Sequence, residues 1–227
     1  LLLSKLTNTY QKVFEKEIDL KAIYTNVTPE YHAYLITKNE PKAYEEITPV
    51  EAQETYELSP SQTRFWLLYK IQGKSKEFNI SNKFSLPENL NLELFQRAFN
   101  TIVERHEILR TTFLEVDAKP RQKVLPYQAV AIDVYAELSL EEIENKVYNY
   151  EFDLAEAPLY KLAIAKEGDV YTLFFNIHHS ISDGWSLNVI VQEVLTVYQN
   201  LITATTVTLP EINVHYKDYT YWQLSLI

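Results

Sequence analysis

The first part of the chain, up to about residue 37, places apolar residues at helical spacing with lysine and glutamine between them. We expect one helix carrying Leu3 to Phe14, a second over Asp19–Tyr24, and a third that starts at Pro29 with Thr28 as its N-cap. A piece this short buries little apolar surface by itself. Residues 38–55 are predicted to be a linker, because their first half is rich in Glu, Lys and Pro.

From residue 56 the pattern changes, and helical stripes alternate with β-type segments. Polar and apolar residues mostly alternate over Phe78–Leu86, which predicts a half-buried strand, whereas the near-continuous run Tyr171–Ile177 predicts a buried one. Strands and helices interleave without a fixed repeat, so residues 56–227 are predicted to form a layered α/β fold. The other expected elements are β-rich segments over Lys123–Tyr135 and Tyr160–Lys166, and helices opened by Ser59, running from Asn91 to near Arg110, over Leu140–Tyr150 and carrying Leu187 to Leu201.

Composition narrows the classes of function. The net charge of -10 argues against a nucleic-acid partner, which would require a basic face. No apolar run approaches the roughly 18 residues of a membrane span, so we expect no membrane partner. A cytoplasmic location is expected, and the absence of cysteine permits it. The chain has no cysteine and only three glycines, which excludes thiolate chemistry and leaves little scope for a phosphate-binding loop. The absence of methionine suggests a piece of a longer polypeptide.

The segment Ile177–Trp185 links the predicted buried strand to the predicted long helix. Neighbouring side chains on a strand point to opposite faces, so His178 and His179 should be separated, one packed and the other presented. The same geometry argues against a metal site, because adjacent imidazoles rarely converge on one ion. Two satisfied histidines followed by an ordinary Asp-Gly turn would be the structural alternative.

A strand-to-helix turn also places polar groups beside a helix N-terminus. Backbone N–H groups there can stabilise a developing oxyanion. Gly184 would let a substrate approach the backbone closely, and Asp183 would cap the helix or pair with a cation. This turn is therefore the strongest candidate for chemistry in the chain.

The turn sequence HHSISDG resembles the HHxxxDG signature of condensation domains of nonribosomal peptide synthetases and of relatives such as chloramphenicol acetyltransferase. Further segments resemble the other condensation motifs and appear in the family's order. The resemblance implies a two-layer α/β sandwich like chloramphenicol acetyltransferase, that is, one lobe of a condensation domain. The matching segments are Leu58–Gln62 with Arg64-Phe-Trp66, Arg105–Phe113, Phe152-Asp-Leu154 with Ala157-Pro-Leu159, and Tyr216–Tyr219 with Trp222.

The helical N-terminal segment, residues 1–37, is similar to the later helices of a peptidyl carrier protein. The matching residues are Leu2–Leu6, Phe14, Ile18–Leu20, Ile23-Tyr24 and Thr28. In that alignment the serine that bears phosphopantetheine would precede residue 1, so Ser4 is not the attachment site.

The resemblance implies peptide-bond formation, in which an acceptor amine attacks a carrier-bound thioester. His179 would deprotonate or orient that amine. His178 would be its packed partner, Asp183 the anchor of the turn and Gly184 the point of close approach. Arg105 and Arg110 would be structural and hold the active-site turn. No cofactor is expected on this lobe, since the substrates would travel on the phosphopantetheine of partner carrier proteins.

The implied partners are upstream and downstream peptidyl carrier proteins, an adenylation domain and a C-terminal condensation lobe that is missing here. Without that lobe we expect an incomplete active site and inefficient catalysis by this chain alone. A stand-alone acetyltransferase completed by trimer formation, a non-catalytic carrier-docking module and an epimerisation domain remain alternatives.

Overall fold

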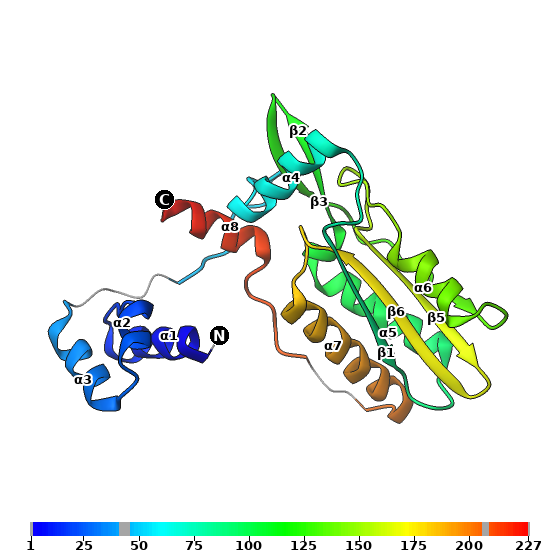
Figure 1. Cartoon of the computed structure of the whole chain (residues 1–227), viewed down its shortest axis with the longest axis horizontal. Coiled ribbons are helices and arrows are strands. Elements are labelled where there is room, and N and C mark those ends of the chain that lie inside the picture. Colours follow the sequence, from blue (N-terminus) through cyan, green and yellow to red (C-terminus); the bar gives the residue numbers. More distant parts are fainter. Residues whose placement is uncertain (1, 41–45, 206–208, 227) are drawn as a thin grey trace. The chain divides into compact units, whose positions relative to one another are not determined.

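The computed structural model describes residues 2–40, 46–205 and 209–226. The chain divides into two compact units, Leu1–Ile47 and Thr48–Ile227, called unit 1 and unit 2 below. No helix in the described part of the chain is long and apolar enough to cross a membrane. The elements of each unit are labelled in Figure 1.

Unit 1 contains the helices that the apolar spacing predicts. Asp19 and Thr28 cap the second and third helix by accepting hydrogen bonds from the backbone N–H groups of Lys21 and Tyr31. Ile23 is fully buried, but no residue of the first helix is. The unit therefore has a very small core. Its helices are α1 (Leu2–Phe14), α2 (Leu20–Thr25) and α3 (Pro29–Lys38).

The core of unit 2 is a four-stranded sheet in the order β1-β6-β5-β4. Its strands run antiparallel except for the parallel pair β4–β5. The strands are β1 (Asn79–Ser85), β4 (Asp133–Tyr135), β5 (Tyr160–Glu167) and β6 (Val170–His178). The strands predicted over Phe78–Leu86 and Tyr171–Ile177 are therefore confirmed as β1 and β6, which are neighbours in the sheet.

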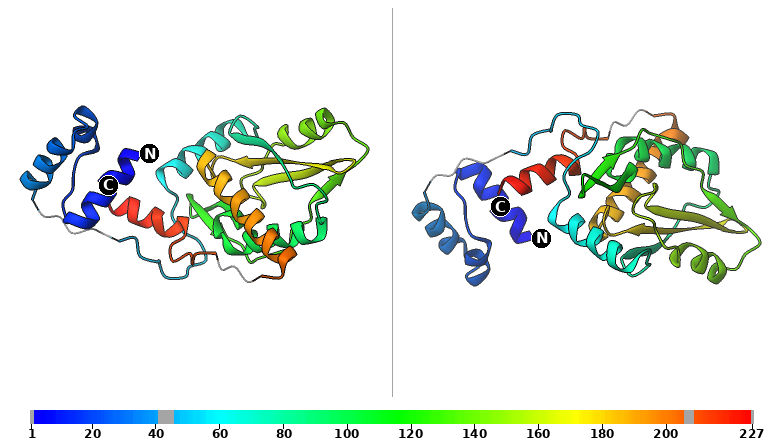
Figure 2. Two further views of the ribbon diagram at one scale, coloured as in Figure 1. Left: turned by 90° about the horizontal axis from the view of Figure 1, so that it is seen from below. Right: turned by 90° about the horizontal axis from the view of Figure 1, so that it is seen from above.

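Side chains alternate between the two faces of β6, as expected for a strand buried on both sides. Leu173, Phe175 and Ile177 face the main core, which also contains residues of α5 (Leu92–Arg105) and α7 (Gly184–Thr203). Phe174 faces the opposite side and packs with residues of α6 (Leu140–Tyr148). Helices α5 and α7 thus lie along one face of the sheet and α6 covers the other (Figures 1 and 2). The predicted α/β layering is confirmed.

The helix predicted from Asn91 to near Arg110 is shorter than expected. The helix from Asn91 ends at Arg105, and a 3-10 turn, η1 (Glu107–Arg110), then leads into a hairpin of β2 (Thr111–Val116) and β3 (Lys119–Val124). The hairpin turn uses positive φ angles of 51° at Asp117 and 58° at Ala118. Such turns normally carry glycine or asparagine, so the sequence gives little signal for this one.

The predicted β region Lys123–Tyr135 is also shorter than expected, because residues 125–132 form no regular element. Side chains of α5 form hydrogen bonds with the backbone of this segment, in place of a neighbouring strand. The Asn100 amide accepts from the Val130 N–H at 2.7 Å and donates to its carbonyl at 3.0 Å. Gln96 Oε1 accepts from the Ile132 N–H at 3.1 Å.

Helix α8 (Tyr216–Ser225) is fastened to the beginning of unit 2 by a buried carboxylate. Asp218 is 2% exposed, and its two oxygens accept from the backbone N–H groups of His215 at 2.7 Å and of Val50 at 2.9 Å. The Tyr216 hydroxyl lies 3.0 Å from Ser59 Oγ. Ser59 is the N-cap of α4 (Pro60–Gln72) and shares a capping box with Gln62, so the same contacts also place α4.

We expect Asp218→Ala to destabilise unit 2 by about 2 kcal/mol, because two part-buried N–H groups would lose their acceptor. All three tryptophans lie in unit 2, so urea unfolding followed by tryptophan fluorescence reports this unit. Glu51→Ala, which removes an exposed carboxylate next to Val50, is the control and should change stability by less than about 0.5 kcal/mol. Equal midpoints for the two variants would show that Asp218 does not fasten α8.

Candidate active site

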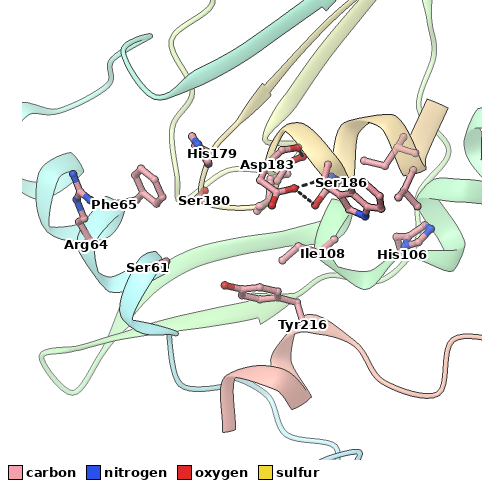
Figure 3. Close-up of a pocket in the computed structure, with 15 residues that line it drawn as sticks. Ser61, Arg64, Phe65, His106, Ile108, His179, Ser180, Asp183, Ser186 and Tyr216 are labelled. Carbon is pink, nitrogen blue, oxygen red and sulfur yellow. Dashed lines mark hydrogen bonds between the residues drawn. The ribbon is translucent and has the colours of Figure 1, made fainter. Parts of the chain in front are cut away.

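A pocket of about 580 Å³ lies between α4, the end of β6 and the start of α7 (Figure 3). The turn after β6 contributes His179 to Asp183, and Tyr216 of α8 lines another side. The remaining lining residues are Ser61, Arg64 and Phe65 of α4, His106 and Ile108 near η1, and Trp185, Ser186, Val189 and Ile190 of α7. The predicted strand-to-helix turn is therefore part of a concave site.

Strand geometry continues to the end of β6 and separates the two histidines. The His178 N–H donates to the Leu159 carbonyl at 2.9 Å, and the His179 N–H donates to the Phe78 carbonyl at 2.8 Å. Backbone partners on both sides thus hold consecutive residues in extended conformation. His178 is 4% exposed and packed, whereas His179 is exposed and lines the pocket. The expectation of one packed and one presented histidine is confirmed.

His178 is held in an aromatic cage and by two polar contacts. Its ring makes edge-on contacts with Phe65, Phe78 and Phe152 at centroid distances of 5.8, 6.4 and 6.3 Å. Its Nδ1 accepts from the Ser180 N–H at 3.1 Å and lies 2.8 Å from Ser180 Oγ. The neutral ring therefore carries its proton on Nε2.

The same surroundings keep His178 uncharged. Burial, with a smaller contribution from the adjacent His179, lowers the pKa of His178 from 6.5 to about 4. His178 is consequently neutral at physiological pH. Of the two neighbouring imidazoles, the one exposed in the pocket is the better placed to exchange protons with a substrate.

Asp183 is the N-cap of α7, which decides between the two roles expected from the sequence. Its Oδ1 accepts from the Ser186 N–H at 2.7 Å and from Ser186 Oγ at 2.6 Å. Although burial opposes the change, these bonds lower the pKa of Asp183 below its ordinary value. Because the carboxylate occupies the Ser186 N–H, that one group of the helix N-terminus is not available to an oxyanion.

Gly184 is the first residue of α7, and nothing within 4 Å would meet a Cβ added there. Its backbone has no positive φ, so neither packing nor conformation requires glycine. The open space beside Gly184 is compatible with the close approach of a ligand.

The hydrogen bonds of Arg105 and Arg110 lie around the end of α5. Arg105 Nε donates to Glu193 of α7 at 3.2 Å, and its guanidinium also bonds the Pro210 carbonyl. Arg110 donates to the carbonyls of Val103 and Glu104, at 3.1 Å each, and of Leu125. Both arginines therefore tie the end of α5 to its surroundings, whereas the turn is fastened by its own backbone and Asp183.

Most residues that line the pocket were not predicted as site residues, among them two aromatic ones. Phe65 touches both histidine rings, and Tyr216 lines the pocket beside α4. Both lie in segments that matched motifs, but which of their side chains reach the site depends on how α4 and α8 pack. No group of metal-ligating side chains occurs among residues 2–40, 46–205 and 209–226.

Comparison with known proteins matches a family model described as the condensation domain to residues 52–226. The chain belongs to the condensation domain family. It is 32% identical over 216 residues to gramicidin S synthase 2 of Aneurinibacillus migulanus, covering 93% of this chain and 5% of that protein. It is 33% identical over 218 residues to tyrocidine synthase 3 of Brevibacillus parabrevis, covering 95% of this chain and 3% of that protein.

Solved structures agree on the fold. The starter condensation domain of rhizomide synthetase RzmA matches with a TM-score of 0.69 and 21% identity, over 77% of this chain and 44% of that one. The X-domain from teicoplanin biosynthesis matches with a TM-score of 0.68 and 20% identity, over 80% of this chain and 40% of that one. The chain thus spans less than half of these solved chains and less than a tenth of the two synthetases.

The lowered pKa of His178 predicts that the stability of unit 2 falls as pH decreases from about 6.5 towards 4. Over that interval His178 binds a proton in the unfolded chain but stays unprotonated in the native state. Because the unfolded state binds more protons, stability rises with pH. The loss between pH 7 and pH 5 should be about 2 kcal/mol from this residue. Urea unfolding at both pH values measures it.

His178→Phe, which keeps a ring in the aromatic cage and removes the titration, should flatten this dependence. The remaining slope would include His215, whose pKa is also lowered, chiefly by burial. An unchanged slope in His178→Phe would show that His178 is not held neutral in the native state.

Proposed function

We propose that unit 2 takes part in peptide-bond formation during nonribosomal peptide synthesis, with His179 as its catalytic residue. The observation that carries the proposal is the exposed imidazole of His179 in the pocket, next to a buried, neutral His178. Membership of the condensation domain family and similarity to peptide synthetases support the same reaction. The residues present supply an acid–base group and require no resident cofactor.

In this reaction the α-amine of the acceptor attacks the carbonyl carbon of the donor thioester. A C–N bond forms, the C–S bond breaks, and the amine proton passes through His179 to the departing thiolate of the carrier. An α-amine has a pKa near 8, so part of it is neutral at physiological pH and needs only a modest base. Orientation of the amine by His179 is therefore as important as proton transfer.

The proposed partners are two peptidyl carrier proteins, whose phosphopantetheine arms deliver donor and acceptor, and an adenylation domain that loads them. A second condensation lobe would form the opposite wall of the pocket. The proposal fits the coverage of 44% of the RzmA chain, since the pocket described here is built from one lobe. We expect this chain alone to catalyse transfer far more slowly than a two-lobe polypeptide, in a cytoplasmic setting.

Unit 1 is proposed to be the C-terminal part of a carrier protein. It lies outside the residues matched by the condensation model, yet the match to tyrocidine synthase 3 covers 95% of the chain and therefore extends into it. Helix α1 has apolar residues on one side but buries none of them, which fits a helix whose packing partners lie elsewhere in the polypeptide. Ser4 lies on this helix and is not proposed as the phosphopantetheine site.

His179→Ala in a two-lobe polypeptide should reduce dipeptide formation between two loaded carrier proteins by about 10²-fold or more. Carrier binding and stability should be unchanged, because the side chain is exposed. Gln192→Ala, which removes an exposed side chain of α7 outside the pocket, is the control. Full turnover by His179→Ala would contradict the catalytic role of His179 and favour the alternative of a non-catalytic docking module. Acetyl-CoA-dependent activity of a trimer of this chain would instead favour the stand-alone acetyltransferase.

Gly184→Ala tests the proposed close approach of substrate. The added methyl group meets nothing in the protein, so the stability should stay within about 0.5 kcal/mol of the unsubstituted chain. Turnover should nevertheless fall, with a rise in KM for the acceptor, because the methyl group would occupy space that the substrate needs. Unchanged kinetics in the same two-lobe assay would mean that the substrate does not pass beside Gly184.

A further inference from the structure

Phe65 of α4 lies against both histidines at the end of β6. Its ring is stacked on the His179 imidazole, with centroids 5.4 Å apart and planes 21° from parallel. The same ring meets His178 edge-on, at 5.8 Å and 79°. Figure 3 shows Phe65 projecting from α4 toward His179 across the pocket. A single side chain thus contacts the packed and the presented histidine.

The His179 ring is restrained by its stack on Phe65, beside an electrostatic interaction with the Asp183 carboxylate. Within the described parts of the chain, the His179 side chain has no hydrogen bond and no ion pair, and Phe65 is its one aromatic neighbour. Its backbone is fixed by the bond to the Phe78 carbonyl, but this leaves the χ angles free. An exposed imidazole at the end of a strand would otherwise sample several rotamers.

Phe65 can serve as a restraint because α4 is itself held at both ends. At the N-terminus, the Ser59–Gln62 capping box is joined to Tyr216 of α8. Toward the C-terminus, the Tyr69 hydroxyl donates to Asp153 Oδ1 at 2.6 Å. Trp66, the next residue, is only 6% exposed. The ring of Phe65 is therefore presented from a fixed helix.

We propose that Phe65 is a positioning residue, which sets the plane of the His179 imidazole for the incoming acceptor amine. The inference rests on the proposed catalytic role of His179. Phe65 acts through His179, by offering a flat face on which one orientation of the imidazole is favoured. Leucine at this position would fill similar space without selecting a ring orientation.

The orientation is tested first in this chain by NMR of the histidine ring protons, with the His179 signals assigned from His179→Ala. Stacking places these protons over the Phe65 face, so they should be shifted upfield, and Phe65→Leu should move them downfield. Phe65→Tyr should preserve the upfield shift. Phe174→Leu, a buried substitution on the opposite face of β6, controls for loss of packing and should leave the signals in place. If the chemical shifts of the His179 ring protons were the same in Phe65→Leu as in the unsubstituted chain, the proposal would be overturned.

The functional consequence is measured by dipeptide formation in a two-lobe polypeptide. Phe65→Leu should lower kcat roughly three- to tenfold, the amount that an aromatic pair contributes, with little change in KM. Phe65→Tyr should restore kcat. A Phe65→Leu variant with displaced His179 signals and full kcat would overturn the positioning role. Loss of all activity in the unsubstituted polypeptide would instead contradict the proposed function, and the NMR comparison would still decide the orientation.

Discussion

The site depends on the backbone hydrogen bonds that carry strand geometry to the end of β6. His178 is bonded toward Leu159 on one side and His179 toward Phe78 on the other, so the two side chains must point in opposite directions. A shift of one residue in this register would bury His179 and expose His178. The pairing of β6 with both β1 and β5 along its length resists such a shift.

The two histidines differ in charge because they differ in surroundings. His178 is enclosed by three phenylalanine rings and accepts hydrogen bonds at Nδ1, an environment that penalises the imidazolium. A charged His178 would repel a proton arriving at His179. In the proposed reaction, a neutral packed ring would leave the presented ring free to act as a base. The core of unit 2 would in this way contribute to the chemistry proposed for the pocket.

The sequence predicted those parts of the fold that local chemistry determines. Thr28, Ser59 and Asp183 were readable at helix starts because their side chains bond backbone N–H groups three residues away. The hairpin at Asp117-Ala118 was missed because it lacks the usual turn residues. Residues 125–132 were mistaken for a strand because Asn100 and Gln96, distant in sequence, satisfy their backbone.

In the candidate site, too, the features set by neighbouring residues were predictable and those set by long-range contacts were not. The separation of His178 from His179 follows from alternation along a strand, which depends only on neighbouring residues and is therefore predictable from the sequence. The stacking of Phe65 on His179 depends on where α4 lies relative to β6, and that placement is set by contacts of Ser59 and Tyr69 with residues far along the chain. Arg105 and Arg110 were expected to be structural, but the sequence could not name their hydrogen-bond partners, which long-range packing determines.

The hydrogen-bond donors of the turn bear on how an oxyanion could be held in the proposed reaction. A tetrahedral intermediate formed beside His179 would need N–H or O–H donors for its oxyanion. Asp183 occupies the N–H of Ser186, the Ser180 hydroxyl lies against His178, and the Ser182 hydroxyl bonds the Asp183 carbonyl at 3.2 Å. These three donors are thus engaged within the turn itself. In the proposed reaction, a second condensation lobe would form the opposite wall of the pocket and would be a further source of donors for the oxyanion.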